Sequence, residues 1–381
     1  MRKHTSLYLD ALRILAALAV FFSHITRESL SAGNPVIRFL GQFGQEGVAI
    51  FFVISGMVIA YVARERDHDF RSYLVARLGR LWSVIFPALI LTVVLDTVGR
   101  LITPEMYPSP PLNLWQWNFS SAWNFIGPLF FLNQVTFATA DPGTNGPFWS
   151  LCYEFWYYIL FGIAYYLRGI PRLLLLVLTA AIAGEKILGL FPIWAFGLVV
   201  YVYLKNSSRN LSVAIWGLSC VALLALMLLK YKISVLFAHN FPAINADSGY
   251  IALWISHFAV GIACAVNIAF YDLCGGSRLL EGSAVERCIR FLAARSFSLY
   301  LYQAPCLFFY GALTYGMHSS VLRILLVILL SLATIFLLAE LTEKKKGRFA
   351  TIVDDMIPIS VFPLTAMKRI EIAEEEDLPL K

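Results

Sequence analysis

Three ionisable residues interrupt an apolar stretch near the N-terminus, residues 8–25 (YLDALRILAALAVFFSHI): Asp10, Arg13 and His24. In a helix of 3.6 residues per turn, Arg13 and His24 share one face and lie about 16 Å apart along the axis. Asp10 lies one turn before Arg13 and can pair with it. A neutral histidine can serve as a base or a nucleophile near neutral pH, and ionisable groups in a membrane segment usually mark a functional path. We therefore expect these three residues to carry chemistry; the alternative is that Asp10 and Arg13 reach the membrane surface while His24 caps the other end.

A second candidate is the sequence RLGR, residues 77–80, which places Arg77 and Arg80 one helical turn apart. Two guanidinium groups at this spacing can bind the phosphates of a cytosolic ligand through paired hydrogen bonds. The alternative is that these arginines, with the others between residues 63 and 80, only hold this loop on the cytoplasmic side of a membrane.

A third candidate is Glu154, which lies about one turn into the apolar stretch NGPFWSLCYEFWYYILF, residues 145–161. The aromatic residues around it are typical of a membrane interface. A carboxyl group among them is not, because it must meet a cation or a hydrogen-bond donor, or carry a proton. We therefore expect Glu154 to be functional.

The composition indicates which elements position these residues. Of the 381 residues, 59% are hydrophobic and 14% are charged, against about 25% charged in a soluble domain. The net charge of +6 does not indicate a nucleic-acid partner, because the basic residues are scattered between apolar runs. The chain is therefore expected to lie in lipid.

A membrane about 30 Å thick requires about 20 mostly apolar residues in a helix. Ten runs approach this length: Leu7–Ile25, Gln45–Val62, Leu81–Val98, Phe148–Leu167, Leu173–Leu190, Phe191–Leu204, Leu211–Leu229, Tyr250–Tyr271, Phe297–Tyr315 and Val321–Leu341. An eleventh run, Trp123–Phe137, is short and contains Gly127 and Pro128, so we expect it to dip into the membrane or lie at the outer face.

The distribution of Lys and Arg predicts the orientation. With ten alternating spans, most basic residues fall on the side of the N-terminus, which is therefore cytoplasmic. The sequence predicts an all-α polytopic membrane protein with about ten transmembrane helices and both termini in the cytoplasm. We assign residues 1–341 to one membrane domain with an outer loop at 99–147, and residues 342–381 to a flexible, charged cytoplasmic tail.

Five motifs, in this order, resemble the membrane-bound acyltransferase-3 family: LDALRILAALAVFFSH, GVAIFFVISGMVIA, the RxxR of residues 77–80, PFWSLCYEFWYY and SFSLYLYQAP. With the ten-span layout, the match covers the chain from about Tyr8 to Leu341. The resemblance implies a bundle of about ten spans that transfers acyl groups, mostly acetyl, from cytosolic acyl-CoA to hydroxyls of extracytoplasmic carbohydrates.

The resemblance also implies roles for single residues. It gives His24 and Arg13 the catalytic role, places Glu154 on the acid of the family's WSLxxE motif, and makes Arg77 and Arg80 the donor-binding pair. The expected supporting residues are Asp10, Trp149, Ser150 and Gln303. Gln303 stands where the family often has a histidine, and Ala49 stands where it often has an acid. If that histidine serves acceptor binding or proton transfer, its replacement by Gln303 predicts an acceptor that differs from the common ones.

The sequence therefore predicts an O-acyltransferase in the bacterial cytoplasmic (inner) membrane. The expected co-substrate is acetyl-CoA or another acyl-CoA, with no metal and no permanently bound cofactor. The expected acceptor is a carbohydrate, extracytoplasmic or lipid-linked, such as an exopolysaccharide or lipopolysaccharide unit; the other partner is membrane lipid and not nucleic acid. The alternative is a transporter or flippase for a glycolipid or small molecule, which predicts two related halves with broken helices; no such repeat is apparent.

Overall fold

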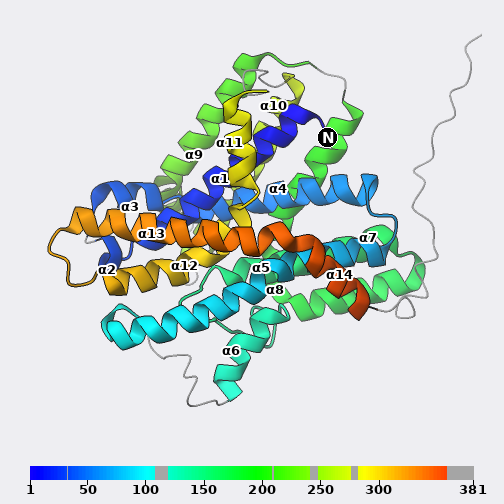
Figure 1. Cartoon of the computed structure of the whole chain (residues 1–381). Helices are drawn as coiled ribbons and strands as arrows, with labels where there is room; N and C mark the ends of the chain where they lie inside the picture. Colours follow the sequence, from blue (N-terminus) through cyan, green and yellow to red (C-terminus); the bar gives the residue numbers. More distant parts are fainter. Residues whose placement is uncertain (32, 108–118, 208–209, 241–247, 276–281, 358–381) are drawn as a thin grey trace, which may run out of the picture.

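The computed structural model describes residues 1–357 except 32, 108–118, 208–209, 241–247 and 276–281. Its described elements are helices, and none is a strand (Figure 1), so the predicted all-α class is confirmed. The long helices are α1 (Lys3–Ile25), α4 (Gly44–Glu65), α5 (Phe70–Ile102), α7 (Phe148–Tyr166), α8 (Gly169–Asn206), α9 (Val213–Asn240), α10 (Ser248–Leu273), α12 (Ser296–Leu313) and α13 (Ser320–Leu341). The shorter ones are α2 (Glu28–Ser31), α3 (Pro35–Gly41), α6 (Phe119–Leu129), α11 (Ala284–Ala293), α14 (Lys346–Met356) and the 3-10 turns Pro104–Met106 and Glu343–Lys345.

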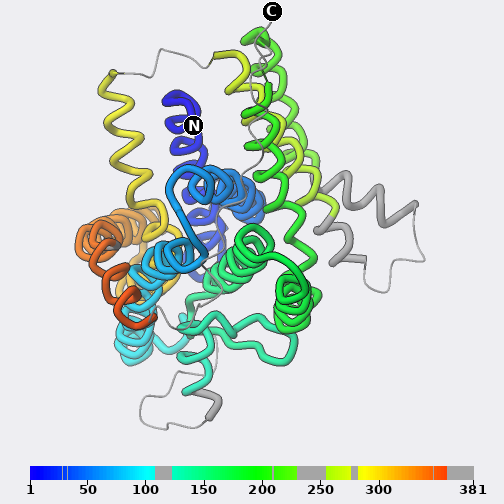
Figure 2. The backbone as a smooth tube through the Cα atoms, turned by 90° about the vertical axis from the view of Figure 1, so that its right-hand side faces the viewer, coloured from blue at the N-terminus to red at the C-terminus, as the bar shows by residue number. Residues whose placement is uncertain are grey.

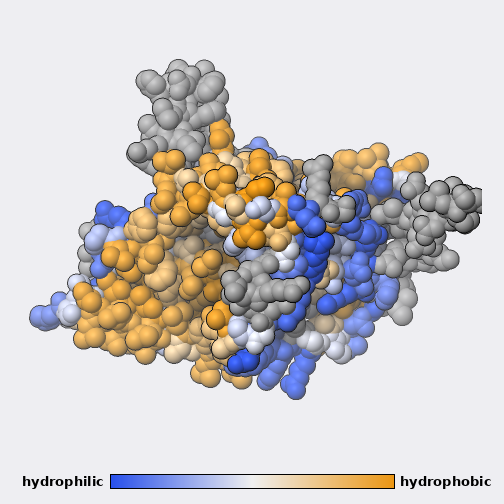
Figure 3. Space-filling model, turned by 90° about the horizontal axis from the view of Figure 1, so that it is seen from above, coloured by the Kyte–Doolittle hydropathy of each residue, from blue (hydrophilic) through white to orange (hydrophobic). Residues whose placement is uncertain are grey.

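The surface is that of a multi-pass membrane protein. Six described helices are long and apolar enough to cross a bilayer. Figure 3 shows a broad apolar face beside a hydrophilic band, and exposed leucines and valines such as Leu174, Leu218 and Leu329 lie on α8, α9 and α13. The count of ten spans and the cytoplasmic placement of both termini stay predictions.

Helix α4 lies at the centre of the bundle, where α1, α8 and α10 pack against it (Figure 2). Glycine makes the closest of these contacts possible. A Cβ atom on Gly47 would lie 2.7 Å from the carbonyl oxygen of Ala16 in α1, and one on Gly56 would lie 2.0 Å from that of Trp194 in α8. Small residues allow helix backbones to approach in this way in membranes.

Helix α8 contains a break that the sequence predicts in the wrong place. We expected two spans that divide after Leu190, but the break lies at Gly184, which has φ +81° and ψ 177°. Only glycine adopts this backbone readily. The break leaves two carbonyl groups without helical donors; the Thr136 hydroxyl donates to Ala181 O at 2.8 Å, and the Thr136 backbone N–H donates to Ile182 O at 3.1 Å.

The eleventh run, Trp123–Phe137, does not form a span. Its helical part belongs to α6, whose 11 residues extend only about 16 Å. The chain then enters the bundle, where Phe131 is buried and its carbonyl oxygen accepts a hydrogen bond of 2.9 Å from the Trp156 indole. This segment carries Gln134 to the interior.

The first part of the expected flexible tail is folded. Helix α14 packs on α5, where a Cβ atom on Gly79 would lie 2.6 Å from the Cα atom of Ala350. Arg71 fixes the end of α14 by pairing with Asp354 and donating to Ile357 O. Residues 346–356 of the expected tail are therefore helical and packed on the bundle. Residues 358–381 lie outside the described residues, and the division into a membrane domain and a tail stays a prediction.

Candidate active site

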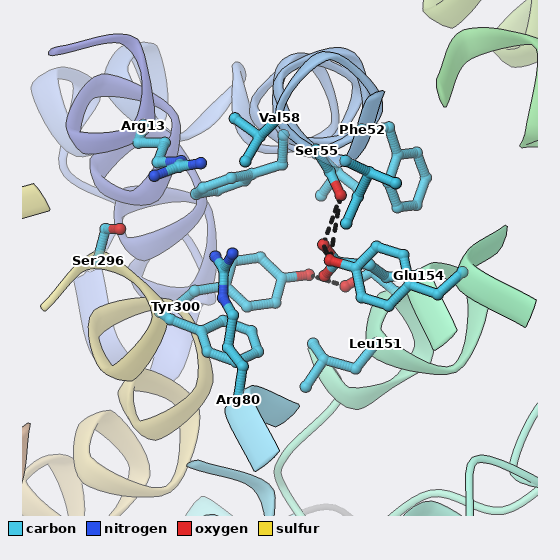
Figure 4. A pocket seen from close by; sticks show the side chains of 15 residues that line it. Arg13, Phe52, Ser55, Val58, Arg80, Leu151, Glu154, Ser296 and Tyr300 are labelled. Carbon is cyan, nitrogen blue, oxygen red and sulfur yellow. Dashed lines mark hydrogen bonds between the residues drawn. The ribbon is translucent and has the colours of Figure 1, made fainter. Parts of the chain in front are cut away.

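One cavity collects several of the expected site residues from five helices. It encloses about 50 Å³ between α1, α4, α5, α7 and α12 (Figure 4). We call it the arginine cavity, because Arg13 and Arg80 reach it from α1 and α5, and Glu154 faces them from α7. Sequence reasoning therefore found its charged groups.

The Glu154 carboxylate is held through one of its two oxygens. Ser55 of α4 donates to Oε1 at 2.6 Å, and the Tyr158 hydroxyl donates to the same atom. Oε2 forms no hydrogen bond or ion pair within the described part of the chain. A fixed carboxylate with one open oxygen can accept a proton from a group that enters the cavity.

Sequence reasoning missed Ser55 and Tyr158, although the signals were present. Tyr158 follows Glu154 by four residues and so lies on the same helix face. Ser55 places a hydroxyl in an otherwise apolar part of α4.

Arg13 is only weakly neutralised. The expected pair is present, with Arg13 Nη1 at 3.6 Å from Asp10 Oδ1. Asp10 also forms an ion pair with Arg290 of α11, whose Nη1 donates to Ser6 Oγ at 2.8 Å. Because Asp10 is shared, Arg13 keeps positive charge available to the cavity.

Arg77 and Arg80 differ sharply, although they lie one turn apart on α5. Arg77 forms a buried ion pair with Asp67 in the loop before α5, and its guanidinium lies 5.1 Å from the centre of the Tyr73 ring. Arg80 lies 5.7 Å from the ring of Phe297, and its guanidinium makes no hydrogen bond or ion pair with a described residue. Arg80 therefore offers its guanidinium to an anion in the cavity, whereas Arg77 is buried and held by Asp67.

The supporting residues of α7 and α12 meet on one side of the arginine cavity. Ser150 Oγ lies 2.5 Å from the hydroxyl of Tyr300, which lines the cavity. Gln303 is buried and donates to Tyr300 O at 2.9 Å. Ser150 and Gln303 thus contact the same residue, and Gln303 does not itself line the cavity.

His24 lies outside the arginine cavity, in the last turn of α1, whereas Arg13 lies near the middle of that helix. Its Nδ1 lies 2.9 Å from Val20 O. Because a carbonyl oxygen only accepts, Nδ1 must carry the proton, and Nε2 then presents a lone pair. The structure brings Arg13, Arg80 and Glu154 together but does not bring His24 to them.

A second cavity of about 340 Å³ adjoins the first, and Val48 and Phe52 of α4 line both. We call it the glutamine cavity, after Gln45 of α4 and Gln134. Gln134 belongs to the stretch that enters the bundle after α6, residues 130–137, which we call the inserted segment. Its other polar groups are Trp149 and Tyr153 of α7, Lys186 of α8 and His257 of α10. Of these, sequence reasoning named only Trp149 as a site residue. Tyr153 lies in the same motif of α7, whereas Gln45, Gln134, Lys186 and His257 come from separate elements outside the quoted motifs.

Comparison with known proteins identifies the family. The family profile described as "Acyltransferase domain" matches residues 6–340. The chain belongs to the acyltransferase-3 family. The resemblance of the motifs is thereby confirmed.

Two relatives agree with this family. Acyltransferase MdmB of Streptomyces mycarofaciens is 31% identical over 185 residues, which are 47% of this chain and 44% of that protein. The O-acetyl transferase of Shigella phage Sf6 is 25% identical over 237 residues, 59% of this chain and 68% of that protein. The chain thus spans less than half the length of MdmB. No solved structure matches the chain.

For an acyltransferase-3 protein, the arginine cavity has a suitable charge distribution. Two cations can stabilise the negative charge that develops on a carbonyl oxygen during acyl transfer, and a carboxylate can accept the proton of the attacking hydroxyl. The described residues include no group of three His, Cys, Asp or Glu that could hold a metal ion.

Proposed function

We propose that this protein is an integral membrane O-acyltransferase that moves an acetyl or similar short acyl group from cytosolic acyl-CoA to a hydroxyl of a carbohydrate. The acceptor is extracytoplasmic or lipid-linked. The observation that carries this proposal is the arginine cavity, where Arg13, Arg80 and the open oxygen of Glu154 meet inside a bundle of this family.

The size of the arginine cavity favours a short acyl group. A volume of about 50 Å³ holds only a few water molecules, since one needs roughly 10–15 Å³ on this measure. Such a space fits an acetyl thioester and excludes a nucleotide. The nucleotide and its phosphates then stay outside the cavity, near the side from which α5 carries Arg80.

The proposed step is a single displacement. The hydroxyl oxygen of the acceptor attacks the thioester carbonyl carbon, a C–O bond forms and the C–S bond breaks. The hydroxyl proton passes to Glu154 Oε2 and then to the leaving CoA thiolate, so that the products are an ester and free CoA. Arg13 stabilises the oxyanion that forms in between, and Arg80 holds the donor through a charged hydrogen bond.

His24 is the alternative base or acyl carrier. Its Nε2 lone pair can accept a proton or an acyl group, but about 16 Å of helix separates it from Arg13. It would act where the acceptor enters, near the far end of α1, and the cavity step above is the simpler assignment in this conformation.

The side of the acceptor follows from the charge distribution. The predicted cytoplasmic segments hold most of the Lys and Arg residues, which favours a donor site open to the cytoplasm and an acceptor on the other side of the membrane. We propose that this membrane is a bacterial inner membrane. The name of the phage Sf6 relative, an O-acetyl transferase, supports acetyl as the acyl group.

The test uses the full chain in lipid nanodiscs with [¹⁴C]acetyl-CoA and an envelope fraction from a strain that lacks this protein. We expect free CoA and labelled esters that mild alkali cleaves. Failure to form either product with well-folded protein would refute the proposed acyl transfer. Esters that form without incorporation of the ¹⁴C label would refute acetyl-CoA as the donor.

A further inference from the structure

The glutamine cavity contains polar groups that the protein itself does not engage. Within the described ranges, the side chains of Gln45, Gln134 and Lys186 form no hydrogen bond or ion pair, and the Trp149 indole N–H donates to no acceptor. Gln45 and Lys186 are exposed and Gln134 and Trp149 are half-buried, so their polar groups are open to a ligand that enters this cavity. Four open groups around one cavity therefore indicate a polar ligand.

Aromatic rings form the other wall of the glutamine cavity. Trp149 and Tyr153 meet edge to face at 5.0 Å, and Phe52 lies 6.3 Å from Trp149. Ligand pockets commonly combine an apolar, aromatic lining with a few placed polar groups. The C–H groups of a sugar ring can pack on such rings while its hydroxyls reach the two glutamine amides.

Lys186 adds a charge to this cavity. It is exposed, and no acidic side chain in the described ranges forms an ion pair with it. It lies two residues after the break at Gly184, which turns this part of α8 toward the inserted segment that carries Gln134. An ammonium group without an acidic partner at a sugar-sized cavity favours an anionic ligand.

The position of the glutamine cavity connects it to the proposed reaction. It shares Val48 and Phe52 with the arginine cavity. Along α4 it begins at Gln45, at the end of the bundle where Gly44 contacts Ser23, the neighbour of His24. The arginine cavity instead extends along α4 to Ile59. A ligand in the glutamine cavity would therefore approach the acyl group from the far side.

We propose that the glutamine cavity is the acceptor site, and that it takes a sugar bearing an anionic group, either a phosphate or a carboxylate, which Lys186 binds. This inference rests on the proposed function. The sugar ring packs on Trp149 and Tyr153, and its reacting hydroxyl points past Phe52 toward Glu154.

The first experiment identifies the charge of the product. Nanodiscs carrying the full chain are incubated with [¹⁴C]acetyl-CoA and the acceptor-containing envelope fraction, and the labelled material is applied to an anion exchanger. We expect retention. Loss of retention after phosphate cleavage would assign the anion to a phosphate, and loss after carbodiimide coupling would assign it to a carboxylate. A labelled product that does not bind the exchanger would overturn the proposal while leaving the acyltransferase activity intact.

The second experiment tests Lys186 itself. The product, deacetylated by mild alkali, serves as the acceptor in rate measurements with Lys186→Gln and with the matched control Lys205→Gln, an exposed lysine in the last turn of the same helix. Loss of a charged hydrogen bond predicts an acceptor KM about 10- to 150-fold higher for Lys186→Gln. The control should match wild type, and the KM for acetyl-CoA should not change in either variant.

The outcomes separate the two proposals. If wild type forms no labelled ester, the proposed function fails. If wild type forms the ester and Lys186→Gln has a normal acceptor KM, only the assignment of the glutamine cavity fails. Since Lys186 is exposed, its replacement should not prevent folding, and a melting curve for each variant checks this.

Discussion

Matched substitutions of Arg77 and Arg80 give the sharpest test of the donor site. Both are arginines on α5, one turn apart, so Arg77→Gln and Arg80→Gln make the same chemical change on the same helix. Their surroundings differ: the side chains of Arg77 and Asp67 are 8% and 9% exposed in a mutual ion pair, whereas Arg80 faces the arginine cavity without such a partner in the described part of the chain.

The expected magnitudes follow from these surroundings. Arg77→Gln leaves the Asp67 carboxylate buried without its cation, and breaking a buried pair lowers the free energy of unfolding by about 3–5 kcal/mol. Arg80→Gln strands no partner but removes a charged hydrogen bond to the donor, about 1.5–3 kcal/mol. The latter corresponds to a rise of about 10- to 150-fold in the KM for acetyl-CoA.

The assay measures both quantities on the same preparations. Thermal unfolding in detergent reports stability, and initial rates at varied acetyl-CoA report KM. Arg80→Gln should unfold near the wild-type temperature with a raised KM, and Arg77→Gln should unfold much earlier. Adding Asp67→Asn to Arg77→Gln should recover part of the lost stability, because the stranded charge is removed. If Arg77→Gln raised KM as much as Arg80→Gln at unchanged stability, the division of roles described above would be wrong.

Three further predictions concern single positions. Glu154→Gln keeps an oxygen for the Ser55 and Tyr158 hydroxyls but cannot accept a proton. Turnover should therefore fall about 10²- to 10⁴-fold while stability stays near normal. Ser55→Ala removes one donor to Glu154 and should lower turnover by a smaller factor. His24→Ala and His24→Gln should both cut turnover by a similar factor if His24 is a base or acyl carrier, and a Gln variant with near-wild-type product formation would remove it from the mechanism. Gly184→Ala should lower the free energy of unfolding by about 1–3 kcal/mol, because the backbone conformation at this position is accessible mainly to glycine. In addition, the added Cβ would lie 2.4 Å from Thr136 Oγ1. A melting temperature equal to that of wild type would contradict the break in α8.

The apolar runs predicted the helices that position the arginine cavity, because lipid imposes a length and a composition on each span. Local spacing also predicted the Asp10–Arg13 pair, since residues three apart meet on a helix. What the runs could not show was the break at Gly184: a single glycine in a long apolar stretch gives no sign of the φ value that it adopts.

The partners of the charged groups were harder to predict than their presence. In the sequence, Arg77 and Arg80 look equivalent. The packing of the loop before α5 places Asp67 beside Arg77, and only there does an ion pair with Asp67 form. The glutamine cavity is harder still, because Gln45, Gln134, Lys186 and His257 come from four distant segments. Helix α14 could have been predicted, since Phe349, Val353 and Met356 recur at helical spacing.

The wall that the two cavities share has a consequence for the energy supply of the cell. If the two cavities open to opposite faces of the membrane, as the proposed topology requires, water that fills them would be separated by Val48 and Phe52, which line both. A continuous chain of water molecules through this point would conduct protons and dissipate the membrane potential. Phe52, which stacks with Tyr153 and meets Tyr157 edge to face, would then act as a barrier to protons as well as a contact of the proposed substrates. A smaller side chain at this position would burden the cell with a proton leak even if every ester were still made.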